Sequence, residues 1–207
     1  YHAEDWGLEI SFSGTDSQGH ETVGWPVNSP EDWSRIEQLD PTVGALGEQL
    51  EAIELIAAET SGEVPLLMTV FPPLAVAAQM AGSVDAMTRL IKENPGALAP
   101  ALDAITETLS AFASQAMSRG AAGLFFATTQ WASYDQLSDD EYANLGRPYD
   151  LRVLEVVSDA EFNALHVCGS DNMLSELRDY PVHAYSWDAQ DDTNVWLVEG
   201  AKLTGKA

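Results

Sequence analysis

Four short apolar segments, separated by helical patterns, constrain the fold of this chain more than any other feature. They cover residues 65–71, 123–128, 162–168 and 182–187. Nearly continuous apolar sequence is typical of strands that are covered on both faces, as in parallel sheets. The helical patterns between the segments predict crossover connections. We therefore expect an α/β fold built on a parallel sheet.

The connecting segments carry the usual signals of helices. Apolar residues recur every three or four positions from Leu98 to Phe112, which predicts a long amphipathic helix, and Asn94-Pro95 is expected to cap it. Ser138 and Glu141 have the spacing of a capping box at the start of a further helix. These signals place helices between the strands, as crossover connections require.

Two architectures fit this alternation, a closed barrel and an open doubly wound sheet. No Gly-x-Gly-x-x-Gly follows the first apolar segment, which argues against the dinucleotide-binding form of the open sheet. We therefore predict a TIM-type (β/α)8 barrel with about four clear β/α units. Before residue 65, short strands are expected at residues 8–12 and 21–25, and helices at residues 29–39 and 43–60.

The charge of the chain excludes several classes of function. It has 33 acidic residues against 9 basic ones, a formal charge of −24, so it lacks the basic surface that nucleic-acid binding requires. The acids are spread along the chain, as on a strongly solvated surface. With one cysteine, no secretion signal and no apolar run long enough for a bilayer, we expect a cytoplasmic protein with no membrane contact.

Ligands of such folds collect where strands end, so the candidate site residues follow the four apolar segments. In the third segment, alternation places His166 and Cys168 on one face of the strand. An imidazole and a thiol could hold one zinc ion, but zinc needs at least three protein ligands and no third has a diagnostic spacing. From the spacing alone, a small buried cysteine beside a hydrogen-bonded histidine explains the pair better.

The other strand ends supply polar and aromatic candidates. Asp188 could carry a proton or anchor a polar ligand, or it could cap a loop. Thr128 and Gln130 could orient a carboxylate or an amide, although loop hydrogen bonds explain them about as well. Phe71 and Trp187 complete the predicted lining of the pocket.

Several segments together resemble the uroporphyrinogen decarboxylase superfamily, which includes zinc-dependent corrinoid and coenzyme M methyltransferases. The segments, in order, are Tyr1 to Gly7, Thr69 to Leu74 with Gly82, Phe125 to Gln130, Leu165 to Gly169, and Tyr185 to Asp188. The resemblance implies an eight-stranded β/α barrel, which typically needs ~250 residues. We therefore expect residues 1–207 to form one domain, an internal piece of such a barrel that lacks its opening and closing strands.

The resemblance implies first a uroporphyrinogen decarboxylase-like lyase that acts on a tetrapyrrole or a related carboxylate without a cofactor. Asp188 and His166 would be catalytic, and Phe71, Thr128, Gln130 and Trp187 would bind the small-molecule substrate. Two departures from the family pattern argue against uroporphyrinogen as the substrate. The active-site tyrosine of these enzymes is matched by Gln79, and their Phe-Asp-Ser-Trp-like loop is replaced by residues 126–131.

The resemblance also implies two alternatives. In the zinc-dependent methyltransferase branch, His166 and Cys168 match two of the zinc ligands. The third ligand of these enzymes is a distant C-terminal cysteine, which would lie beyond Ala207, and a corrinoid protein is the partner. In the second alternative the chain is a truncated barrel without activity. A homodimer is a further expectation for the chain.

Overall fold

The computed structural model describes residues 2–12, 14, 19–60 and 62–206. Its centre is a four-stranded parallel sheet in the order β3-β4-β5-β6. The strands are β3 (Leu67–Val70), β4 (Gly123–Thr128), β5 (Ala164–Val167) and β6 (Ala184–Trp187). All four predicted strands are therefore confirmed, each within the segment assigned to it.

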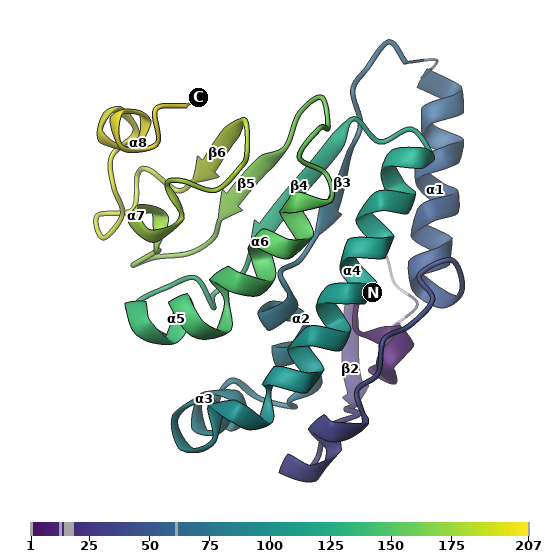
Figure 1. Cartoon of the computed structure of the whole chain (residues 1–207), viewed down its shortest axis with the longest axis vertical. Coiled ribbons are helices and arrows are strands. Elements are labelled where there is room, and N and C mark those ends of the chain that lie inside the picture. Colours follow the sequence, from purple (N-terminus) through teal and green to yellow (C-terminus); the bar gives the residue numbers. More distant parts are fainter. Residues whose placement is uncertain (1, 13, 15–18, 61, 207) are drawn as a thin grey trace.

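The connections between the strands are those of a β/α barrel. Each strand pairs in parallel with the next strand along the chain, and helices lie between them in sequence. Figure 1 shows the four strands side by side, with their arrows pointing toward the same end of the sheet. Among the described residues, β3 and β6 each pair with one neighbour only, so the sheet is an arc and the barrel is incomplete.

Helices cover one face of the sheet. In chain order they are α1 (Gly44–Thr60), α2 (Pro73–Met80), α3 (Val84–Glu93), α4 (Ala99–Ser118), α5 (Asp139–Leu145), α6 (Arg147–Glu155), α7 (Leu174–Leu177) and α8 (Leu197–Thr204). The long helix α4 packs against α6, α2 and α1, and its Leu102, Ile105, Leu109 and Phe112 are fully buried. The amphipathic pattern read from the sequence is thus confirmed.

The two faces of the sheet differ in burial. On the helix side, side chains of adjacent strands are at most 6% exposed: Met68, Val70, Leu124, Phe126, Leu165 and Val167. On the opposite face, Thr69, Phe125 and His166 are partly exposed and Ser186 is exposed. The core therefore lies between the sheet and the helices, and the inner face of the arc is open within the part of the chain that the structure describes.

The described residues also form three short 3-10 helices: η1 (Glu4–Trp6), η2 (Pro30–Arg35) and η3 (Pro95–Ala97). Two of them, η2 and η3, lie where the sequence predicted longer helices or a helix cap. The helix expected at residues 29–39 extends only over η2. The long helix does not begin at the predicted Asn94-Pro95 cap, because η3 intervenes and α4 starts at Ala99. The reason is that Pro95 and Gly96 suit a tight turn better than a helix interior. The capping box of Ser138 and Glu141 is confirmed at the start of α5.

An antiparallel hairpin of β1 (Glu9–Phe12) and β2 (His20–Gly24) precedes the barrel arc. Figure 1 shows β2, α2 and α3 gathered at the end toward which β3 and β4 point. The hairpin and these helices therefore stand beside the carboxyl ends of the strands. None of the described helices is both long and apolar enough to cross a membrane.

Candidate active site at the carboxyl ends of the strands

His166 lies on the inner face of the sheet, near the end of β5. It is level with Ala127 of β4 and Ser186 of β6. Its half-buried ring stacks on Phe125, with 5.6 Å between the ring centroids, and its Nδ1 lies 3.2 Å from Oγ of Ser186. These two contacts fix the ring, while Nε2 has no hydrogen-bond partner among the described residues.

Cys168 follows β5 directly and carries a free, exposed thiol. Strand alternation predicts that it lies on the same side as His166, and Gly169, with a φ of 83°, turns the chain immediately afterwards. Cys168 lies one residue beyond the strand, so the common face of the imidazole and the thiol stays a prediction. The thiol is exposed, so burial of a small cysteine does not explain the pair.

Thr128 points to the other face. It is 2% exposed, and its hydroxyl donates a hydrogen bond to the carbonyl oxygen of His166 at 2.9 Å. This bond ties the end of β4 to β5 from the helix side. Thr128 thus holds the backbone of His166, and its own hydroxyl is engaged within the protein.

Gln130 is exposed and lines a cavity of about 330 Å³ beside the end of β4. Trp25 from the end of the hairpin, Gln79 from α2 and Trp131 line the same cavity. Phe71, at the end of β3, packs instead against the ring of His2, with 4.9 Å between ring centroids. The aromatic ring of Phe71 therefore belongs to the contact between β3 and the amino-terminal segment.

The end of β6 is occupied mainly by structural contacts. The indole N–H of Trp187 donates to the carbonyl of Val195 at 2.7 Å, and its ring packs so closely on Gly200 that a Cβ there would lie 2.3 Å away. Asp188 is exposed, and its Oδ1 accepts a hydrogen bond from the backbone N–H of Gln190. In this geometry Asp188 supports a turn. This is the loop-capping role that the sequence analysis gave as the alternative to proton transfer or ligand binding.

The amino-terminal segment contacts the start of α1 and the end of β3. The Asp5 carboxylate accepts hydrogen bonds from the backbone N–H groups of Ala45 and Leu46 at 2.8 and 2.9 Å, at the start of α1. His2 is fully buried, and burial lowers its pKa to about 3. The segment from His2 to Gly7, which is part of the family resemblance, therefore has a structural role. Tyr1 lies outside the described residues.

The sequence profile of the uroporphyrinogen decarboxylase (URO-D) family matches residues 1–205. The chain belongs to this family. It is an incomplete member of a barrel fold, since four parallel β/α units are present and the sheet is open at both edges among the described residues. The fold predicted from the alternation of strands and helices is thereby confirmed.

Two curated relatives of this family member are methylcobamide:CoM methyltransferases. The protein from Methanosarcina mazei is 24% identical over 207 residues, in an alignment that covers 98% of this chain and 60% of the relative. The protein from Methanosarcina acetivorans is 24% identical over 183 residues, covering 86% of this chain and 53% of the relative. The chain thus spans somewhat over half the length of these relatives.

A solved structure gives the same fold. A methyltransferase from Methanosarcina mazei superposes with a TM-score of 0.70 at 23% identity, covering 98% of this chain and 58% of that one. At this identity the likeness establishes the fold of the family member.

The donor atoms at the end of β5 suit part of a zinc site. Imidazole nitrogen and cysteine sulfur are common zinc ligands, and a structural or catalytic site uses at least three protein ligands. Across the ranges that the structure describes, no group of three or more His, Cys, Asp or Glu side chains could hold a metal ion. His166 and Cys168 therefore fit two ligand positions.

One buried polar cluster was not found by sequence reasoning. The Asp150 carboxylate on α6 accepts hydrogen bonds from the hydroxyls of Tyr142 at 2.7 Å and Tyr180 at 2.9 Å. Burial raises the pKa of Asp150 to about 7, and the two hydroxyls and the charge of Arg147 oppose that rise. Sequence spacing gives no sign of the cluster, because its members come from three separate segments.

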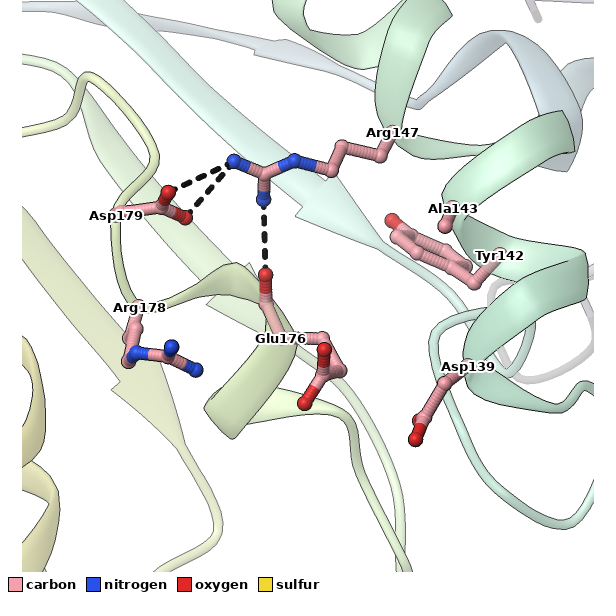
Figure 2. Close-up of a pocket in the computed structure, with 7 residues that line it drawn as sticks. All are labelled: Asp139, Tyr142, Ala143, Arg147, Glu176, Arg178 and Asp179. Atoms are coloured by element: carbon pink, nitrogen blue, oxygen red, sulfur yellow. Dashed lines mark hydrogen bonds and ion pairs between the residues drawn. The ribbon is translucent and has the colours of Figure 1, made fainter.

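Figure 2 shows the surface pocket of about 160 Å³ beside this cluster. Arg147 reaches across it, donating to both carboxylate oxygens of Asp179 and to the carbonyl of Glu176, each at 2.9 Å. Its guanidinium also lies over the ring of Tyr180. These contacts join the start of α6 to α7 and to the segment that follows α7.

Proposed function

We propose that this chain is part of a methyltransferase that moves a methyl group between a corrinoid protein and a thiol substrate. One observation carries the proposal. The carboxyl end of β5 carries an imidazole, His166, and directly after the strand an exposed thiol, Cys168, in a family member whose curated relatives are methylcobamide:CoM methyltransferases. In barrel enzymes this end of the strands holds the active site.

The residues around His166 prepare it as a ligand. The contact of Nδ1 with Ser186 leaves Nε2 as the nitrogen available to a metal, and the stacked Phe125 restricts the ring. The bond from Thr128 holds the backbone of His166 in register with β4. Such outer contacts orient metal-binding histidines and raise their affinity.

His166 and Cys168 would hold zinc together with a third protein ligand from outside the described residues. Bound zinc would favour the thiolate form of the substrate thiol at neutral pH. Cys168 is exposed, so the position beside it is accessible to a small thiol.

The decarboxylase hypothesis has less support. Both curated relatives are methylcobamide:CoM methyltransferases, and the end of β5 carries an imidazole and an exposed thiol. The cytoplasmic location and the homodimer stay predictions.

Cobalt(II) binding to the protein that contains this chain tests the proposal, because the third ligand comes from outside the described residues. Cobalt(II) replaces zinc and gives a thiolate-to-metal charge-transfer absorption when a cysteine is bound. We expect this absorption in the unaltered protein, a clear reduction of it in Cys168→Ser, and cobalt affinity at least about tenfold weaker in His166→Ala. Ser170→Ala, in the same loop, is the matched control. Equal cobalt spectra in the unaltered protein and in Cys168→Ser would refute the ligand assignment.

Methyl transfer is the second test, with a methylated corrinoid protein and a thiol as substrates of the protein that contains this chain. We expect Cys168→Ser to lower the rate by orders of magnitude without changing the urea midpoint. An unchanged rate would show that the thiol has no part in the reaction.

A further inference from the structure

The cavity beside the end of β4 has an unusual lining for this protein. It measures about 330 Å³ and is walled by Trp25, Gln79, Gly82, Thr129, Gln130 and Trp131 among others. In a chain with a formal charge of −24, none of its lining residues is ionisable. The cavity therefore suits a neutral ligand and gives a charged one no partner.

Its polar groups are available for a ligand. The carboxamides of Gln79 and Gln130 make no hydrogen bond with any residue that the structure describes. The indole N–H of Trp131 likewise has no acceptor among those residues, although the side chain is only 5% exposed. Two carboxamides supply both donors and acceptors, which is the pairing that another carboxamide requires.

The aromatic wall is built by a close approach of the hairpin to α2. Gly82 has a φ of 77°, and a Cβ at this position would lie 3.7 Å from the ring of Trp25. The positive φ favours glycine at this turn, and an added Cβ would make only an ordinary van der Waals contact with the indole. The ring of Trp25 remains 37% exposed, so part of its surface can contact a bound molecule.

The cavity adjoins the candidate metal ligands. Thr128 pairs with Val167 in the parallel register of β4 and β5, so Thr129 follows β4 at the level at which Cys168 follows β5. Neighbouring strands lie about 4.8 Å apart. A ligand that extends from this cavity along the strand ends would therefore reach the space above Cys168.

We propose that this cavity is a carboxamide subsite, which takes the amide-bearing edge of the cobamide whose methyl group is transferred. This rests on the proposed function, because corrin rings carry neutral carboxamide side chains around their rim. Ligand pockets for whole small molecules measure about 300–1,000 Å³, so a cavity at the lower end accepts one or two side chains rather than the whole ring. Gln79 and Gln130 pair with the amides, and Trp25 contacts the edge of the ring.

Equilibrium dialysis of the 207-residue chain with cyanocobalamin tests the subsite. We expect Gln79→Glu and Gln130→Glu each to weaken binding about tenfold. A carboxylate has no N–H group, so it cannot donate a hydrogen bond to the carbonyl oxygen of the ligand's amide. Trp25→Ala should weaken binding by a similar factor. Trp196→Ala, an exposed tryptophan of the segment before α8, is the matched control and should bind as the unaltered chain does.

Two further measurements keep the outcome clear. Propionamide should compete with cyanocobalamin in the unaltered chain, which separates recognition of the amide from recognition of the corrin. Circular dichroism of each variant checks that it folds. Unchanged binding in both glutamate variants, or no binding of cyanocobalamin to the unaltered chain, would overturn the carboxamide subsite.

The cobalt experiment on His166 and Cys168 separates this proposal from the proposed function. If cobalt binding depends on Cys168 while the glutamate variants bind cyanocobalamin normally, the methyltransferase proposal stands and the subsite falls. If cobalt binding does not depend on Cys168 but the glutamate variants lose cyanocobalamin, the subsite stands without the metal site.

Discussion

The two faces of the sheet use the same strands for different purposes. On the helix side, Phe126 and its neighbours in β3 and β5 are fully or almost fully buried, whereas Phe125 and His166 on the inner face are partly exposed. Burial of apolar area is the main source of stability, so the helix side should hold the fold together. The inner face can then carry polar groups at little cost, which is what a ligand site requires.

The largest effect expected from this comparison concerns the two adjacent phenylalanines of β4. Phe126→Ala should lower the free energy of unfolding by about 3–5 kcal/mol, because it opens a cavity in the packed layer. Phe125→Ala removes a partly exposed ring and should cost much less. Urea denaturation of both variants measures the difference. Equal losses would show that the inner face contributes to stability as much as the helix side does.

The helix layer also contains the buried acid, Asp150, which should make stability depend on pH. Asp150 has a pKa of about 7 in the folded chain against 3.8 as its ordinary value, so the folded state binds more protons between these values. This contribution is complete below about pH 4 and is lost as the pH rises to 7. Its size is at most roughly 4 kcal/mol.

The measurement is the difference in unfolding free energy between the unaltered chain and Asp150→Asn, taken from pH 4 to pH 8. The asparagine does not titrate, so the unaltered chain should lose stability relative to the variant as the pH rises. Asp192→Asn, which alters an exposed acid, serves as control. A pH-independent difference would mean that Asp150 titrates alike in the folded and unfolded chains.

Thr128 connects the two faces, and its effect should be smaller. Thr128→Val keeps the shape of the side chain but removes the hydroxyl that bonds to the carbonyl of His166. We expect a loss of about 1 kcal/mol in unfolding free energy. Thr129→Val, outside the strand, should change it less. If both variants match the unaltered chain, the bond between the strands adds nothing to stability.

The smallest effect on stability is expected on the inner face itself. Ser186→Ala removes an exposed hydroxyl 3.2 Å from Nδ1 of His166 and should change the unfolding free energy by less than about 0.5 kcal/mol. Cobalt affinity should nevertheless fall about tenfold, because the ring of His166 loses its orienting contact. If Ser186→Ala changed the unfolding free energy but left cobalt affinity unaltered, the inner face would contribute to stability rather than to ligand binding.

The candidate site was partly predictable. Strand alternation alone placed His166 and Cys168 on one face, because successive side chains of a strand point to opposite sides. The prediction that Thr128 lines the same pocket was not confirmed, because its side chain faces the helix side, and this orientation and its bond to the carbonyl of His166 depend on the register in which β4 pairs with β5. The cavity of Trp25, Gln79 and Gln130 was not predictable as a unit, since only folding brings the hairpin, α2 and the end of β4 together.

The sequence by itself determined the alternation of strands and helices, the parallel arrangement of the strands and the acidic composition of the surface. These follow from local periodicity and composition, which act over a few residues at a time. Only the tertiary structure decided which strand ends carry free polar groups and which are occupied, as Trp187 and Asp188 are by their loop contacts. The reason is that a hydrogen-bond partner is set by distance in space, and residues far apart in sequence compete for the same groups.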